Sequence, residues 1–172
     1  GMMQESGLVT YETVPLPNAC MEDLDQELLH SYLNNLQVGG DSPNKVLLQA
    51  LGFIAESDNG ALVPTTGAML LFGRNPFIFL PQSYVKITRD EEVYHITGNI
   101  FSMVQKTCSL IRDLIQDPLY PYEAIEEALG NALVHRDYLD NSRGVHVDVK
   151  ENCIEISNPG ALVAGNKSVK YL

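Results

Sequence analysis

The stretch Glu126-Glu127-Ala128-Leu129-Gly130-Asn131-Ala132-Leu133-Val134-His135-Arg136-Asp137-Tyr138 decides the fold and carries most of the functional information. Apolar residues recur after Pro121 at the spacing of an amphipathic helix: Ile125, Ala128, Leu129, Ala132 and Leu133. Polar residues four apart fall on one face of that helix and are called the polar ridge below: Glu123, Glu127, Asn131 and His135. We therefore predict a helix that buries one side and presents the polar ridge on another.

The polar ridge offers a carboxylate, a carboxamide and an imidazole in succession, and two interpretations of it remain open. Polar residues at this spacing are normally just the solvated side of a helix. Alternatively, a phosphate-bound Mg²⁺ sits against the ridge. Asn131 would then supply a hard oxygen ligand to the metal, and Glu127 would act as the catalytic residue that orients or deprotonates a water.

The order of the residues favours the second interpretation. Glu-x-x-x-Asn-Ala, from Glu127 to Ala132, resembles the N-box of the GHKL ATPases, the superfamily of gyrase, Hsp90, histidine kinases and MutL. The longer string from Glu127 to Tyr138 is similar to one branch of these proteins. That branch comprises bacterial and archaeal transcriptional regulators, often labelled RecG-like helicases, that carry a Schlafen AlbA-like domain at the N-terminus.

Two further segments match this branch in the right order. Residues 64–76 resemble its Thr-x-Ala-x-Leu-Leu-Leu-Phe-Gly-Lys-x-Pro segment, and residues 154–160 resemble its Ile-Glu-Ile-Ser-Asn-Pro-Gly. The resemblance thus runs from residue 20 to residue 172. The AlbA-like domain of the family has no counterpart in this chain.

The predicted fold class is α+β, in three parts. Residues 1–20 form an extended arm or linker, residues 21–118 form a helical and mixed segment, and residues 119–172 form the first part of an incomplete GHKL (Bergerat-type) sandwich. Asp117-Pro118 ends a helix and marks the boundary between the last two parts. The resemblance implies that residues 161–172 only begin the lid and the second glycine-rich phosphate loop. We therefore expect a shortened or degenerate copy that does not turn over ATP itself, and at most a weak ATPase in a full-length parent.

Local patterns predict the remaining elements. We expect helices that begin at Met21 or Asp23, after Ser42-Pro43, after Thr65 or Thr66 (ending at Gly73) and after Gly98; a tight turn at residues 57–60; and strands at 84–88, 92–96, 145–149 and 153–157. The first two helices invite a helix-turn-helix interpretation. We favour packing, because the second helix offers only Lys45 and Gln49 as base or phosphate contacts.

The resemblance places ATP against Glu127 and Asn131, with the adenine at the loop that begins at Asn158. Most of the superfamily has an aspartate here, which accepts a hydrogen bond from the adenine amino group, followed by glycines that let the backbone approach the nucleotide. Asn158 stands in the place of that aspartate but brings no charge, and Gly160 is the first glycine of the loop. An ordinary Asn-Pro-Gly turn remains the alternative.

His135 and Arg136 also have two interpretations each. Near the nucleotide phosphates, either cation would stabilise transferred charge. Alternatively, Arg136 compensates the dipole at the end of the helix and forms a salt bridge with Asp137. We predict that Tyr138 is a core or rim aromatic and not a stacking platform.

The composition argues against several classes of function. The net charge is −11, from 22 acidic against 11 basic residues, which would repel a phosphate backbone. DNA binding is therefore expected only through a domain absent from this chain. The Gly-x-x-x-x-Gly-Lys-Ser/Thr loop of a helicase does not occur in the sequence.

The chain is expected to be cytoplasmic and to have no membrane partner. It contains no apolar run of the ~20 residues needed to span a bilayer, and no secretory leader. Cys20, Cys108 and Cys153 are far apart, which fits buried free thiols in a reducing compartment. Neither the cysteines nor the histidines show the spacing of metal ligands.

Two function hypotheses follow. In the first, the chain is the middle of a nucleotide-responsive transcriptional regulator, in which binding of ATP and Mg²⁺ alters domain arrangement or homodimerisation. In the second, it is a non-catalytic interaction and dimerisation module with a degenerate nucleotide site. The N-box would then be retained for packing around Ala128, Leu129 and Ala132.

Overall fold

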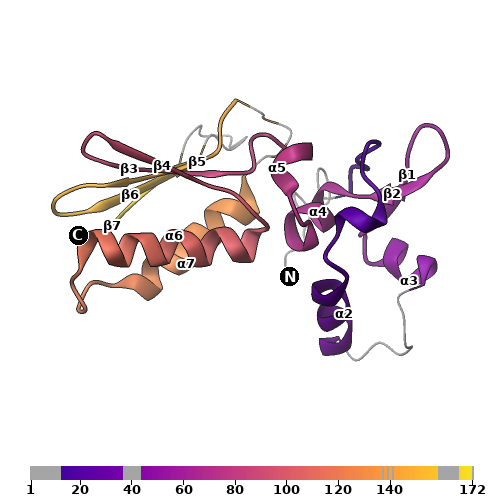
Figure 1. Ribbon diagram of the computed structural model, residues 1–172, viewed down its shortest axis with the longest axis horizontal. Coiled ribbons are helices and arrows are strands. Elements are labelled where there is room, and N and C mark those ends of the chain that lie inside the picture. Colours follow the sequence, from indigo (N-terminus) through magenta and orange to yellow (C-terminus); the bar gives the residue numbers. More distant parts are fainter. Residues whose placement is uncertain are drawn as a thin grey trace. The chain divides into compact units, whose positions relative to one another are not determined.

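The computed structural model describes residues 13–36, 44–136, 138, 140, 142–158 and, as backbone, 167–171. The chain forms two compact units, Gly1–Phe79 and Leu80–Leu172. Helices in both units accompany a two-stranded sheet in the first and a five-stranded sheet in the second (Figure 1). The predicted α+β class is therefore confirmed.

The first unit contains short elements around an apolar core. In chain order they are η1 (Met21–Asp23), α2 (Gln26–Asn35), α3 (Lys45–Ala50), β1 (Ile54–Glu56), β2 (Leu62–Pro64), α4 (Thr66–Phe72) and α5 (Pro76–Phe79). The rings of Tyr32, Phe53 and Phe72 pack edge to face, with centroids 5.1 to 5.7 Å apart. Such pairs add to the stability of a core beyond the area that they bury.

The predicted turn at residues 57–60 joins β1 to β2, which pair antiparallel. Gly60 has a φ of +86°, a conformation that glycine adopts without strain. The predicted helix after Thr65 is also confirmed, because the Thr65 side chain accepts a hydrogen bond from the amide of Ala68 and the helix ends at Gly73. Thr65 also forms an isolated β-bridge with Pro15, so residues 13–19 run beside this cap. Residues 1–12 lie outside the described residues.

The first long helix begins later than predicted. The Cys20 amide donates to the Asp23 carboxylate at 2.8 Å, and Met21–Asp23 form a 3-10 turn instead of the first turn of an α-helix. Leu24 is extended and forms an isolated β-bridge with Gly73, so α2 starts only after its cap, Asp25. This contact with a residue distant in the sequence explains why the local pattern misplaced the helix start.

The cap of α3 also differs from the prediction. Asn44 accepts a hydrogen bond from the amide of Leu47 at 2.8 Å and is the N-cap. Ser42 and Pro43, the predicted pair, lie outside the described residues. Asn is as good a cap as Ser, so both positions were chemically acceptable.

The second unit is a mixed sheet with helices. Its elements are β3 (Val85–Arg89), β4 (Glu92–Ile96), α6 (Ile100–Ile115), α7 (Tyr122–His135), β5 (Val145–Val149), β6 (Ile154–Asn158) and β7 (Lys167–Tyr171). The strand order is β4-β3-β5-β6-β7. Every neighbouring pair is antiparallel except β3 and β5, which are parallel. The four predicted strands are confirmed. The strand β7 was not predicted, since the resemblance placed the start of a lid there.

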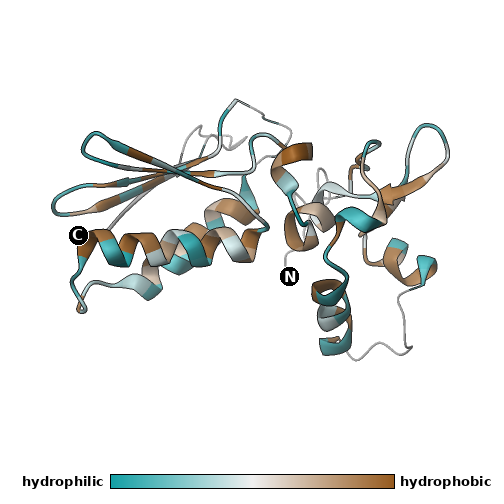
Figure 2. Ribbon diagram, viewed as in Figure 1, coloured by the Kyte–Doolittle hydropathy of each residue, from teal (hydrophilic) through white to brown (hydrophobic). Residues whose placement is uncertain are grey.

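Helices α6 and α7 lie side by side and cover the same face of this sheet (Figure 1). Apolar residues alternate along each strand and face the helices, among them Val85, Ile87, Val147 and Ile156, all nearly fully buried. The other face is polar and carries Lys86, Thr88, His146 and Asp148. Figure 2 shows the alternation as brown and teal segments along the strands. This one-sided pattern is typical of a sheet with a single covered face.

The boundary between the compact units differs from the predicted one at residue 118. The sheet continues across that point, because β3 before it pairs with β5 after it, Val85 lying opposite Val145. The chain divides between Phe79 and Leu80 instead. Asp117 and Pro118 belong to the turn that joins α6 to α7 within one unit.

The cysteines only partly match the prediction of buried thiols. Cys108 is buried, and burial raises the pKa of its thiol. Cys153 is half-buried, but Cys20 is exposed. None of the helices in the described residues has the length and apolar character that crossing a bilayer requires.

Candidate functional site

Helix α7 has the two sides that the sequence predicts. Its buried side consists of Ile125, Leu129 and Leu133, each at most 1% exposed, and packs toward α6 and β6. All four residues of the polar ridge are exposed: Glu123, Glu127, Asn131 and His135. The ridge side chains are therefore accessible to a ligand, and packing of the helix does not require them.

Asn158 joins the end of β6 to α7. It is the last residue of the strand and only 7% exposed, on the face of the sheet that the helices cover. Its Nδ2 donates a hydrogen bond to the Ala132 carbonyl at 3.3 Å. Ala132 follows Asn131, so Asn158 is bonded to the backbone of α7 one residue away from Asn131. Gly160, the predicted loop glycine, lies outside the described residues.

Arg136 is fully buried, whereas its neighbour His135 is exposed. One guanidinium nitrogen donates to the carbonyls of Arg143, at 2.6 Å, and Gln82, at 3.2 Å, and the other terminal nitrogen donates to the Asp140 carbonyl. Arg136 therefore ties the segment before β3 to the loop before β5. The predicted contact of Arg136 with phosphate stays a prediction, and Asp137, its predicted salt-bridge partner, lies outside the described residues.

Tyr138 belongs to the same buried cluster. It is 3% exposed, its hydroxyl donates to the Leu133 carbonyl at 2.6 Å, and its ring lies 4.9 Å from the Arg136 guanidinium carbon. This confirms the prediction of a core aromatic. The Gln82 side chain donates to the Tyr138 carbonyl, a role that sequence reasoning missed. Nothing in the local sequence distinguishes a buried Gln before a strand from an exposed one.

The loop beside this cluster carries an acidic group with a shifted pKa. The Ser142 amide donates to the Asp140 carboxylate at 2.9 Å, and hydrogen bonding by Ser142 lowers the pKa of Asp140. The Arg136 guanidinium acts in the same direction, with a smaller effect. The Asp140 carboxylate therefore stays ionised at neutral pH and fixes the loop turn that supplies carbonyls to Arg136.

No cluster of three or more His, Cys, Asp or Glu side chains in the described residues could hold a metal ion. The predicted Mg²⁺ site is of another kind, because Mg²⁺ is usually bound by one or two protein oxygens together with phosphates and waters. Asn131 is exposed on the polar ridge and its carboxamide oxygen fits that role. Its role as a metal ligand stays a prediction.

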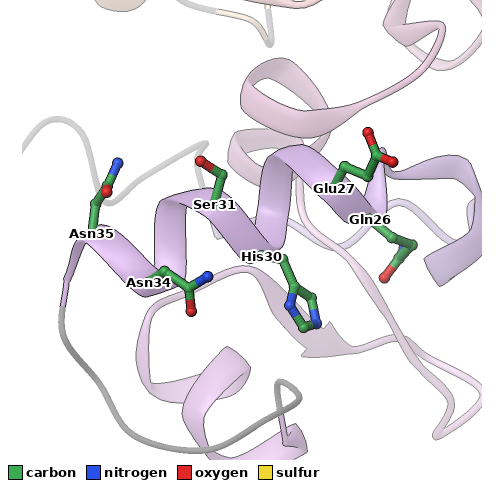
Figure 3. Close-up of a pocket in the computed structure, with 6 residues that line it drawn as sticks. All are labelled: Gln26, Glu27, His30, Ser31, Asn34 and Asn35. Carbon is green, nitrogen blue, oxygen red and sulfur yellow. The ribbon is translucent and has the colours of Figure 1, made fainter.

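A hollow lies in the first unit, along α2 (Figure 3). It has a volume of about 580 Å³ and is lined by Gln26, Glu27, His30, Ser31, Asn34 and Asn35. Figure 3 shows Gln26, His30 and Asn34 pointing to one side of the helix and Glu27, Ser31 and Asn35 to another. The Gln26 amide nitrogen also donates to the Met21 carbonyl at 2.8 Å. These side chains do not converge on a common point, and we assign them no chemistry.

Comparison with known proteins supports the fold alone. No protein-family model matches the chain, and no curated protein matches it significantly. Among solved structures, the chain is similar to the DIP2311 protein from Corynebacterium diphtheriae, a structural genomics target, with a TM-score of 0.54 and 16% sequence identity. The match covers 90% of this chain and 33% of that one, so the chain spans about a third of the length of that protein. The shared feature is the α+β architecture, within which α7 carries the polar ridge.

Proposed function

We propose that α7 and β6 form the nucleotide-binding part of a GHKL-like module in a transcriptional regulator. ATP and Mg²⁺ would bind against Glu127 and Asn131. One observation carries the proposal: both side chains are exposed on a helix whose neighbouring residue, Ala132, is bonded to the end of β6 through Asn158. The elements that would contact the phosphates and the base therefore adjoin one another.

The ridge residues suit the chemistry of a bound metal nucleotide. The Asn131 oxygen would coordinate Mg²⁺, which also contacts phosphate oxygens and waters. Glu127 lies one helical turn earlier and would orient a water toward the terminal phosphate. The exposed His135, one turn after Asn131, would lie beside the phosphates, while the buried Arg136 holds the end of the helix. We expect binding with at most slow hydrolysis.

Asn158 would receive the adenine. Its Nδ2 is oriented by the bond to the Ala132 carbonyl, which leaves its amide oxygen, buried among the described residues, as the atom that would accept a hydrogen bond from the adenine amino group. Hydrogen bonds to a neutral acceptor are roughly half as strong as those to a carboxylate. Selection of adenine over guanine by this chain is therefore expected to be weaker than with an aspartate at this position.

The test is calorimetric titration of the chain with ATP and Mg²⁺. We expect saturable binding that is lost in Asn131→Ala and when the Mg²⁺ is chelated. The matched control is Glu123→Ala, which removes another exposed residue of the polar ridge two turns before Asn131 and should leave the affinity unchanged. Unchanged affinity in Asn131→Ala would overturn the role assigned to that residue.

A second function has one observation in its favour. The side chains of Arg136 and Asn158 are both buried and both bonded to backbone carbonyls within the unit. This is what a non-catalytic interaction and dimerisation module with a degenerate nucleotide site would retain. In that case no nucleotide would shift the unfolding temperature of the chain, whereas the first function predicts a shift that depends on Mg²⁺.

A further inference from the structure

The edge strand β4 of the five-stranded sheet has little protection against pairing with another strand. The outermost strands are β4 and β7. Charged side chains, lysine above all, discourage strands from adding to the edge of a sheet. The sequence of β4, Glu-Val-Tyr-His-Ile, contains neither Lys nor Pro, and its unbroken register with β3 leaves no bulge. The one acidic residue of β4, Glu92, stands at the start of the strand, so residues 93–96 carry none of the Lys, Pro, Asp or Glu residues that prevent pairing.

The outer side of β4 can accept another strand. In the described part of the chain, β4 pairs with β3 alone. Alternate residues of an antiparallel strand direct their N–H and C=O groups away from the neighbour that they pair with. The side chain of Val93, which lies opposite Thr88, is 51% exposed. The edge thus combines available backbone groups with exposed apolar surface.

We propose that β4 pairs antiparallel with β4 of a second copy of this chain, with the two-fold axis at Tyr94. In that register Val93 lies opposite His95 of the partner subunit, and Glu92 lies opposite Ile96 of the partner subunit. The surface is self-complementary, as a two-fold interface requires. The two sheets become one continuous sheet. This interface does not depend on nucleotide binding.

The charges around β4 select the antiparallel arrangement. The acidic residues Glu91 and Glu92 lie at the start of the strand, and Lys106 lies at its end, with its Nζ 3.3 Å from the Thr97 carbonyl. Antiparallel pairing brings the acidic start of one copy to the basic end of the other. Parallel pairing would place like carboxylates opposite each other, which is destabilising.

Sedimentation equilibrium tests the association. We expect a concentration-dependent dimer of the unmodified chain and a monomer for Val93→Lys, which places a charge at the centre of the paired edge. The control is Asn152→Lys, which makes the same charge change at an exposed turn between β5 and β6 and should still dimerise. A chain that stays monomeric up to about 1 mM, or a Val93→Lys variant that dimerises as well as the control, would overturn the proposal.

Disulfide trapping tests the register. In a Cys20→Ser background, Tyr94→Cys should cross-link under mild oxidation, because residues on the axis would have Cα atoms about 4.5–5.5 Å apart, within disulfide reach. Glu91→Cys is the control, since its two copies would lie roughly 20 Å apart. Cross-linking of both variants to the same extent, or of neither variant in a chain that dimerises, would overturn the Tyr94 axis. These measurements contain no nucleotide, so their outcome is separate from that of the titration.

Discussion

The two sides of α7 differ in the contacts that their side chains make. On the buried side, Leu129 packs against apolar neighbours, and the Arg136 guanidinium at the end of the helix is bonded to backbone carbonyls. On the polar ridge, Glu127 and Asn131 are exposed. His135 and Arg136 are adjacent in sequence, yet the first lies on the ridge and the second in the interior. The fold therefore accounts for the residues of the buried side, whereas those of the ridge fit either a solvated helix face or the proposed ligand.

The largest effect on stability is expected from Arg136→Met. The substitution keeps the length of the side chain but leaves the buried carbonyl of Gln82 and the part-buried carbonyl of Asp140 without the guanidinium donors. Hydrogen bonds to charged groups contribute about 1.5–3 kcal/mol each. We expect the free energy of unfolding to fall by about 3–5 kcal/mol in urea titrations. Arg143→Met is the control, because it changes an exposed side chain and retains the carbonyl that accepts from Arg136. Equal stability of the two variants would contradict the structural role of Arg136.

Leu129→Ala should have the next largest effect. Leu129 is fully buried in the middle of α7, so its truncation leaves a cavity and lowers the free energy of unfolding by about 2–4 kcal/mol. Ala itself favours helix, so the loss would report packing and not helix propensity. A loss below about 0.5 kcal/mol, typical of surface positions, would mean that α7 does not pack as described.

A smaller effect on the free energy of unfolding, one that depends on pH, is expected from His146 on the polar face of the sheet. Its Nε2 lies 2.8 Å from the Thr88 hydroxyl. Burial, aided by the nearby Lys86 and Arg143, lowers the pKa of His146, against the opposing effect of Asp148 and Glu155. The unfolded chain therefore binds the proton more tightly than the folded one. The corresponding stability is fully present above pH 6.5, the ordinary pKa, and is lost as the pH falls toward the folded-state pKa.

The measurement is urea unfolding between pH 5 and pH 8, the range in which histidine titrates. Below the ordinary histidine pKa, the free energy of unfolding of His146→Gln should depend less on pH than that of the unmodified chain. Ser31→Ala, at an exposed position of α2, serves as the control and should retain the pH dependence of the unmodified chain. An identical pH dependence in all three chains would show that His146 does not titrate differently on folding.

The smallest effect on stability is expected on the polar ridge. Asn131→Ala removes an exposed side chain from the middle of a helix, so the free energy of unfolding should change by less than about 0.5 kcal/mol. The same substitution should abolish Mg²⁺-dependent nucleotide binding. A loss of stability as large as that of Leu129→Ala would remove the distinction between the two sides of the helix.

Features that depend on neighbours in the sequence could be predicted. The spacing of Ile125, Leu129 and Leu133 identified the buried side of α7, and alternation identified β3 and β5, because both patterns are local. The order of the strands is not local. Asp117-Pro118 ends a helix equally well inside a unit or between units, so only the pairing of β3 with β5 shows that the boundary lies elsewhere.

The buried cluster around Arg136 shows the same limit for the candidate site. An arginine at the end of an amphipathic helix was expected near phosphate or near Asp137, and its contacts with the carbonyls of Gln82, Asp140 and Arg143 were not predicted. Every residue has a backbone carbonyl, so the sequence does not indicate which carbonyls will accept hydrogen bonds from Arg136. For the exposed ridge the local pattern was sufficient, since its accessibility follows from the helical period alone.

The parallel pairing of β3 with β5 also sets the order in which the second unit can fold. Val85 and Val145 are 145 − 85 = 60 residues apart, so their pairing must close a long loop, whereas the β3–β4 and β5–β6 hairpins and both helices form from nearby residues. Hairpins and helices form within about 10 µs, and non-local pairing follows more slowly. We expect the central pair to form last. Until then the apolar sides of both helices and both hairpins are exposed, which makes this stage of folding the one most open to aggregation.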